Sequence, residues 1–292
     1  MFAGSLVAIV SPMRADGAID FDAWARLLDF HAANATDGIV VGGTTGESAT
    51  LRDGELRELL LRACEQLHGR MAVIAGAGTS STASTVERVE WLSELPIDAL
   101  LVVTPAYNRP PQEGLYGHFA AVAAAARKPL LLYNVPARTA VDMQPATVAR
   151  LARLNGIVGV KEAVPDPARV QELVALCPPD FAVLSGDDAT ARASIAAGAR
   201  GVISVTANVA PRAMSQMLVT ARRGDAARAA ELDVPLSALH RDLFVEANPI
   251  PVKWLLAQLG LIGPGIRLPL MPLAGEHHAR LLAAARSAGV LA

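Results

Sequence analysis

Lys161 is the residue of this chain whose type and surroundings point most directly to chemistry. It follows the run Ile157-Val158-Gly159-Val160, which is rich in β-branched residues and typical of a buried strand. Burial of an ammonium group is costly, so a buried lysine is either paired with an opposite charge or held as a neutral amine. A neutral amine can attack a ketone to form an imine. The alternative is a lysine at a strand end whose amino group extends into water.

A glycine-rich loop after another apolar run is the second candidate site. Residues 42–47 have the sequence Gly-Gly-Thr-Thr-Gly-Glu. The glycines permit a tight turn with positive φ, and this structural role is always available. Such a turn also exposes backbone N–H groups beside the hydroxyls of Thr44 and Thr45, which suits a carboxylate or a phosphate. Because the loop lacks the Gly-Lys-Ser/Thr ending of a P-loop, a carboxylate is the preferred ligand.

Other catalytic patterns are weak in this sequence. Residues 46–50 resemble a nucleophile elbow but end in Thr50 where that motif needs glycine, which disfavours a serine hydrolase. The six histidines do not fall at zinc spacing with acidic partners. Asp187-Asp188 could bind a divalent metal, but no other carboxylate cluster supports this, and capping a helix N-terminus is the preferred role. We therefore expect no metal site.

The elements that must position these residues repeat regularly. Short apolar runs alternate with stretches of helical periodicity, and the runs are continuous, as expected for parallel strands covered on both faces. Eight such units in about 220 residues favour a closed (β/α)8 TIM barrel over an open doubly wound sheet. The expected strands are residues 5–10, 38–41, 72–75, 99–103, 130–133, 157–160, 182–184 and 201–204.

Functional groups of such a barrel gather at the C-terminal ends of its strands. Loop 42–47, Tyr107, Tyr133 and Lys161 all follow or end predicted strands, so we expect them at one mouth. Tyr133 alone would more often be a half-buried core residue. Beside an imine-forming lysine on the next strand, it is a plausible proton shuttle.

The last quarter of the chain has a different pattern. Strand signals stop after about Thr220, and residues 226–239, 248–259 and 275–288 have the pattern of helices separated by Pro/Gly turns. We expect a catalytic barrel over 1–224 and a C-terminal helical extension over 225–292. No low-complexity linker separates the two, so a rigid junction is expected.

Composition limits the classes of function. Of the 292 residues, 52% are hydrophobic and 18% charged, which predicts a globular protein with a sizeable core. A net charge of −2 gives no reason to expect nucleic acid or an anionic membrane as the main partner. The two cysteines form neither a metal-ligand spacing nor a disulfide framework. With no signal-peptide or transmembrane pattern, we expect a soluble cytoplasmic protein.

Several long blocks resemble the dihydrodipicolinate synthase family, and the resemblance covers essentially the whole chain. The family belongs to the pyruvate-dependent class I aldolases, which include N-acetylneuraminate lyase. The blocks that carry the resemblance are residues 1–5, 42–50, 107–110, 112–116, 133–136, 185–188, 201–208 and 244–254, together with Leu268-Pro269.

The resemblance implies a lyase of lysine and diaminopimelate biosynthesis that condenses pyruvate with L-aspartate 4-semialdehyde. Lys161 matches the family's Schiff-base lysine, so pyruvate would be bound covalently without any other cofactor. Tyr133 matches the general acid/base, with Thr44 and Tyr107 completing a proton relay. In the family that second tyrosine comes from a neighbouring subunit, which implies a dimer as the smallest complete catalyst. We expect a homotetramer arranged as a dimer of dimers.

The resemblance also implies how the two substrates are held. Thr45 and the backbone of Ile203 match positions that hold the pyruvate carboxylate. Arg138 matches the arginine that holds the carboxylate of the semialdehyde, and a planar guanidinium suits a bidentate grip. The alternative within the superfamily is an N-acetylneuraminate lyase or a 2-keto-3-deoxy sugar-acid aldolase, which Arg138 and the double threonine disfavour. A non-catalytic barrel scaffold is the alternative of a different class.

A departure from the family pattern concerns feedback inhibition by L-lysine. Sensitive members place polar or ionisable groups at the positions of Asp53, Leu56, Ser80 and Ser84, and an aromatic residue at that of Ala106. Here Leu56 and Ala106 offer neither a hydrogen bond nor a stacking face, and only Ser48 and Ala49 follow the pattern. Each missing polar partner of a desolvated ligand costs about 1–3 kcal/mol. We therefore expect weak or absent inhibition by lysine.

Overall fold

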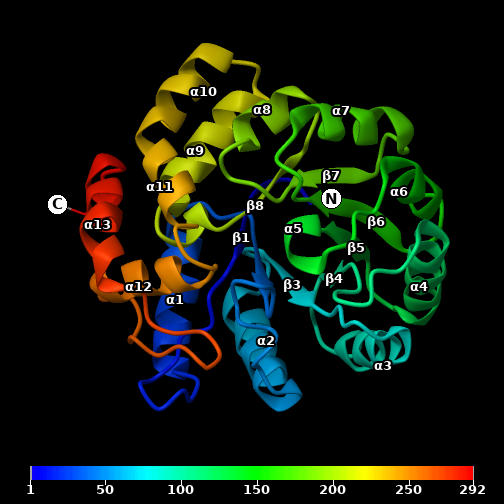
Figure 1. The fold of residues 1–292 in the computed structure, drawn as a ribbon, viewed down its shortest axis with the longest axis horizontal. Helices are drawn as coiled ribbons and strands as arrows, with labels where there is room; N and C mark the ends of the chain where they lie inside the picture. Colours follow the sequence, from blue (N-terminus) through cyan, green and yellow to red (C-terminus); the bar gives the residue numbers. More distant parts are fainter. Residues whose placement is uncertain (1, 292) are drawn as a thin grey trace.

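The computed structural model describes residues 2–291 and shows the expected closed barrel of eight parallel strands (Figure 1). Neighbours in sequence are neighbours in the barrel, and β8 pairs with β1 to close it. Each strand lies within two residues of its expected position. The strands are β1 Gly4–Ala8, β2 Gly38–Val41, β3 Ala72–Gly76, β4 Ala99–Val103, β5 Leu130–Asn134, β6 Ile157–Glu162, β7 Ala182–Ser185 and β8 Gly201–Ser204.

Helices surround the barrel, and their ends follow local sequence signals. Asp20, Ser81 and Asp166 each cap the N-terminus of a helix with a side-chain oxygen. Proline occupies the first turn of four of the barrel helices, where its missing N–H is no loss. The barrel helices are α1 Phe21–Ala33, α2 Asp53–Leu67, α3 Thr82–Leu92, α4 Gln112–Ala125, α5 Pro136–Thr139, α6 Pro145–Leu151, α7 Pro167–Leu176, α8 Ala191–Ala196 and α9 Pro211–Arg222, with the 3₁₀ turn η1 Thr206–Asn208 after β8.

The C-terminal extension is helical, as expected, but one expected helix is divided. The 3₁₀ turn η2 (Val234–Leu236) interrupts residues 226–239, because Pro235 has no N–H to continue an α-helix. Four α-helices and the turn η3 (Gly275–His277) follow from residue 226 to residue 287, and α10 packs along α9. These helices are α10 Ala226–Asp233, α11 Ser237–Asp242, α12 Ile250–Gln258 and α13 His278–Ser287. No helix within residues 2–291 is long and apolar enough to cross a membrane.

The strands are buried on both faces, as continuous apolar runs predict. Along β4, Leu100 and Val102 belong to the outer core beneath the helices, whereas Leu101 belongs to the inner core of the barrel. The same alternation on β5 directs Tyr133 inward. The inner core consists mainly of Leu6, Ala8, Val40, Ile74, Leu101, Leu131, Tyr133, Leu184 and Ile203.

A buried ion pair joins the extension to the barrel. Lys253 on α12 contacts the carboxylate of Glu47, and both side chains are at most 4% exposed. Burial lowers the pKa of Lys253, and the Glu47 carboxylate opposes that shift. The Arg267 backbone N–H also donates to Glu47, and the Arg267 guanidinium donates to Glu55 and to the Thr50 carbonyl. Because Glu47 ends the glycine-rich loop, this contact ties that loop to the last quarter of the chain.

Replacing Lys253 with methionine should lower the free energy of unfolding by about 3–5 kcal/mol, because Glu47 would keep a buried charge without its partner. The matched control is Arg62→Met, which removes the cation of the exposed Arg62–Glu58 pair on α2 and should cost at most about 1 kcal/mol. Urea unfolding at one fixed protein concentration measures both changes. Equal losses of unfolding free energy in the two variants would contradict the stabilising role given to the buried Lys253–Glu47 pair.

Candidate active site

A cavity of about 580 Å³ opens at the C-terminal ends of the strands. This is the face of a (β/α)8 barrel where active sites form. Seven strands or their following loops and the extension contribute to its wall. The lining residues used below are Thr44, Thr45, Tyr133, Arg138, Lys161, Val205 and Asn248, and the extension adds residues 244–247.

Lys161 and Tyr133 lie side by side in this cavity. They are register partners in the β5–β6 ladder, and their side chains are 6% and 7% exposed. The Lys161 Nζ atom lies 4.3 Å from the centre of the Tyr133 ring. Among residues 2–291, no carboxylate oxygen lies within 4 Å of Nζ, so no direct ion pair occupies the amine. The expected juxtaposition of a buried lysine and a tyrosine on adjacent strands is therefore present.

The glycine-rich loop presents both threonines to the cavity. Gly42 has a φ of +66°, and a Cβ on Gly76 would lie 2.1 Å from the Gly42 carbonyl oxygen, so both positions require glycine. These close approaches hold Thr44 and Thr45 at the mouth. Thr45 is 2% exposed, and its hydroxyl oxygen accepts a hydrogen bond of 2.9 Å from Asn248 Nδ2.

Arg138 enters the cavity from α5, the single helical turn that follows β5. Its guanidinium donates to the backbone carbonyl of Asn248 at 3.3 Å. Asn248 Oδ1 is buried, and no residue within 2–291 donates a hydrogen bond to it. Asn248 therefore links Thr45 to Arg138. Asn248 is not among the site residues predicted from the sequence, although it falls inside the block 244–254 that resembles the family.

Two expected site residues lie away from the cavity of the single chain. Ile203 is fully buried in the inner core, and Val205, two residues later, lines the cavity instead. Tyr107 is 92% exposed with a φ of +74°, and its backbone N–H donates to the Thr139 carbonyl at 3.3 Å. Thr44 and Tyr107 are therefore not brought together within one chain.

The positions expected to form the lysine-binding cleft surround the starts of α2 and α3. Asp53 begins α2 and pairs with Arg88, so its carboxylate already has a cationic partner. Leu56 is 3% exposed and packs over Gly42. The remaining positions are the exposed Ala49, Ser80 and Ser84 and the half-buried Ser48 and Ala106.

Asp187 and Asp188 have different roles, and neither is the N-cap residue of α8, which is Thr190. Asp187 Oδ2 accepts from the N–H and hydroxyl of Thr190, directly before α8. Asp188 Oδ2 instead accepts from the N–H groups of Val205 and Thr206 at 2.9 and 2.8 Å, and so caps the turn η1 after β8. Within residues 2–291, no group of three His, Cys, Asp or Glu side chains is arranged to hold a metal ion.

Comparisons with known proteins agree with the geometry. The model of the dihydrodipicolinate synthetase family matches residues 1–288. The 4-hydroxy-tetrahydrodipicolinate synthases of Dechloromonas aromatica (strain RCB) and Ectopseudomonas mendocina (strain ymp) are each 52% identical to this chain over 292 residues, covering 100% of both sequences.

Solved structures show the same likeness. The chloride-inhibited dihydrodipicolinate synthase from Acinetobacter baumannii, complexed with pyruvate, is 44% identical and superposes over 100% of both chains with a TM-score of 0.98. The dihydrodipicolinate synthase from Thermotoga maritima is 39% identical, with a TM-score of 0.97 over 100% of both chains. This chain belongs to the dihydrodipicolinate synthase family.

Proposed function

We propose that this chain is a 4-hydroxy-tetrahydrodipicolinate synthase, a lyase that condenses pyruvate with L-aspartate 4-semialdehyde in lysine and diaminopimelate biosynthesis. Full-length relatives that carry this name support the proposal. The observation that carries it is the Lys161–Tyr133 pair, buried side by side in a polar cavity at the strand ends. This arrangement supplies an amine nucleophile and a neighbouring proton carrier.

Lys161 would attack the keto carbon of pyruvate through its neutral Nζ. The resulting carbinolamine loses water to give an iminium, which draws electrons from the pyruvate methyl group. Loss of one methyl proton gives an enamine, whose carbon attacks the aldehyde of the semialdehyde. The substrate's own amine then displaces Lys161 and closes the ring. Tyr133, beside Nζ, carries protons for these steps, with Thr44 as its partner in the relay.

Separate groups would hold the two carboxylates. Thr45 would bind the carboxylate of pyruvate together with the backbone of Ile203, whose side chain is buried and which precedes the cavity-lining Val205 by two residues. Arg138 would hold the carboxylate of the semialdehyde, because its guanidinium reaches the cavity from the opposite loop. This cation favours an acceptor with a carboxylate over the sugar-derived aldehydes of the lyases in the same superfamily. The filled catalytic positions also argue against a non-catalytic scaffold.

A second copy of the chain would complete the proton relay. Tyr107 is a large exposed side chain on the loop after β4, and it is not among the residues in 2–291 that line the cavity. We infer that the partner subunit's Tyr107 joins Thr44 and Tyr133, so that a dimer is the smallest complete catalyst and a homotetramer its assembly. The barrel 1–224 would carry the chemistry, with region 225–292 closing one side of the cavity. A cytoplasmic location fits this biosynthetic role.

Borohydride reduction in the presence of pyruvate should add one reduced pyruvyl group to the chain, and peptide mass analysis should place it on Lys161. The chemical reason is that borohydride reduces the iminium to a stable secondary amine. Lys161→Ala should show no adduct and should lose essentially all activity. An adduct on another lysine, or none in the wild type, would refute the mechanism.

Arg138→Ala should raise the KM for the semialdehyde by about 10- to 150-fold, since a charge-assisted contact contributes about 1.5–3 kcal/mol. The KM for pyruvate should change far less. Steady-state kinetics with each substrate varied in turn measure both values. Arg138→Lys should recover only part of the loss, because a lysine cannot form the bidentate contact. Equal effects on both substrates would contradict the assigned role.

L-lysine should inhibit the enzyme weakly or not at all. The hydrophobic Leu56, the small Ala106 and the Asp53–Arg88 pair leave a bound ammonium and carboxylate short of partners. Initial rates measured over a lysine titration test this expectation. Half-inhibition at sub-millimolar lysine would show that other residues bind it.

A further inference from the structure

A second pair of side chains lies directly behind Lys161 and Tyr133. In the β5–β6 ladder, the register pair Tyr133–Lys161 is followed by the pair Asn134–Glu162. Successive residues of a strand point to opposite faces, so Asn134 and Glu162 face the helices rather than the cavity. Both are at most 1% exposed. A buried amide and carboxylate at this position need specific partners.

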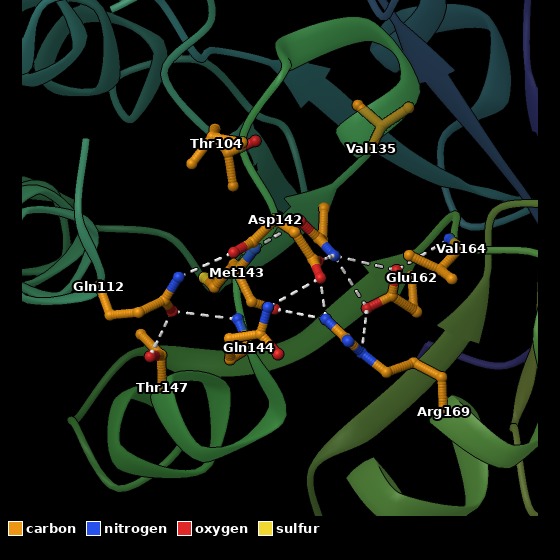
Figure 2. A network of polar contacts seen from close by, with 12 residues as sticks. Thr104, Gln112, Val135, Asp142, Met143, Gln144, Thr147, Glu162, Val164 and Arg169 are labelled. Carbon is orange, nitrogen blue, oxygen red and sulfur yellow. Dashed lines mark hydrogen bonds and ion pairs between the residues drawn. The ribbon is translucent and has the colours of Figure 1, made fainter. Parts of the chain in front are cut away.

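Asn134 connects three segments through one amide group (Figure 2). Its Nδ2 lies 3.1 Å from each carboxylate oxygen of Glu162 and 2.8 Å from Asp142 Oδ1. Its Oδ1 accepts from the Met143 N–H at 3.0 Å. Asn134 therefore fixes β5 to β6 and, at the same time, to the segment that follows α5.

Arg169 on α7 completes the network from the other side (Figure 2). It donates to Asp142 Oδ1 at 2.7 Å and to the Met143 carbonyl at 2.8 Å, and its Nε lies 3.5 Å from Glu162 Oε2. The guanidinium side chain is 13% exposed. The Arg169 guanidinium thus lies close to two carboxylates, that of Glu162 on β6 and that of Asp142 in the segment after α5.

Hydrogen-bond donors surround the Glu162 carboxyl group. The N–H of Val164 and the amide of Asn134 donate to its oxygens, and Arg169 Nε lies 3.5 Å from Oε2 without forming a hydrogen bond. Burial raises the pKa of the Glu162 carboxyl and the nearby Asp142 carboxylate adds to the rise, whereas the two donors and the Arg169 charge oppose it. Substituting a glutamine here would direct an NH₂ group toward donors, with no acceptor to receive it.

Gln112 anchors the network to two further helices. Its Oε1 accepts from the Gln144 N–H and from the Thr147 hydroxyl, and its Nε2 donates to the Asp142 carbonyl. Gln112 begins α4 and Thr147 lies in α6, so several helices brace the segment around Asp142. These contacts restrict the movement of the segment around Asp142, which in turn contacts Asn134 and Arg169.

The network also closes the loop that carries Arg138. Asn134 lies just before that loop, whereas Asp142 and Met143 lie just after it, and the Asn134 side chain bonds to both. Inside the loop, the Thr139 hydroxyl makes further contacts with the Val135 and Val141 carbonyls. The side chains of Asn134, Asp142, Glu162 and Arg169 therefore support three features: Tyr133, Lys161 and the base of the turn that carries Arg138.

We propose that Asn134, Asp142, Glu162 and Arg169 are positioning residues, which hold Lys161, Tyr133 and the Arg138 turn in their reactive arrangement from behind the barrel wall. The inference rests on the proposed function, because it assumes that Lys161 forms the imine. None of the four lines the cavity, so each acts through its neighbours. Small misplacements of reacting groups slow a reaction by about 100-fold, which sets the size of the expected effect.

The first test is Glu162→Gln, with Glu113→Gln as its matched control. Glu113 lies beside Gln112 on α4 and pairs with Arg150 at the surface, so the control makes the same substitution outside the network. Glu162→Gln should lower kcat and the rate of borohydride trapping on Lys161 by about 10- to 100-fold, because the mismatched donors displace the end of β6. Glu113→Gln should stay within about twofold of the wild type.

The second test compares two substitutions of Asp142. Asp142→Asn keeps an Oδ1 acceptor for Arg169 and Asn134. It loses only the hydrogen bond from Gln144 Nε2 to Oδ2, and Gln144 is exposed and can turn to water, so the variant should retain activity within about threefold. Asp142→Ala removes the acceptor and should lower kcat while raising the KM for the semialdehyde more than that for pyruvate, because the Arg138 turn loses its support. Circular dichroism and thermal unfolding of each variant give the fraction that is folded, and rates are expressed per folded chain.

The outcomes separate the two proposals. If the wild type forms no adduct on Lys161, the proposed function fails. If the wild type forms the adduct and Glu162→Gln folds, a trapping rate and kcat equal to those of Glu113→Gln overturn the positioning role alone. If Glu162→Gln does not fold, the comparison of Asp142→Asn with Asp142→Ala tests the positioning role instead. Equal activity per folded chain in Asp142→Asn and Asp142→Ala then overturns the inference, and rescue by asparagine supports it.

Discussion

The register of the β5–β6 ladder is the constraint on which the rest of the site depends. It places Lys161 opposite Tyr133 on the inner face and Glu162 opposite Asn134 on the outer face. A slip of one residue would exchange the two faces, burying the carboxylate in the apolar interior and turning the amine toward the helices. The inner pair supplies the chemistry. The outer pair, with Asp142 and Arg169, is matched only in this register, so the polar network also specifies the strand pairing.

Much of this arrangement could be predicted from the sequence, because the relevant signals are local. Continuous apolar runs marked the strands, and Lys161 stood out since an ionisable group at the end of such a run is costly. Thr44 and Thr45 were found through the glycines around them. Pro235 is also visible in the sequence, but the helical periodicity on either side of it predicts one continuous helix, whereas the structure has a 3₁₀ turn there.

The rest of the site depends on contacts between residues far apart in the chain. Asn248 reaches Thr45 across 203 residues, and Asp188 binds the N–H groups after β8 rather than those of its own helix. Arg169 meets Asp142 across 27 residues that include α6 and β6. Each of these polar residues has an unremarkable local context, so its type alone cannot identify its partner. Closure of the barrel creates the pairing.

The glycine-rich loop, residues 42–47, contacts two parts of the molecule that lie far apart in the sequence. On one side it presents Thr44 and Thr45 to the cavity beside Lys161, and on the other Glu47 meets Lys253 and Arg267. During synthesis from the N-terminus, all eight strands precede these two cations on the ribosome. A nascent chain of 224 residues therefore contains the whole barrel but lacks the counter-charge for a carboxylate at its mouth. The order of translation therefore places the last part of the cavity wall, residues 244–248, and the Lys253 counter-charge on α12 after the whole barrel.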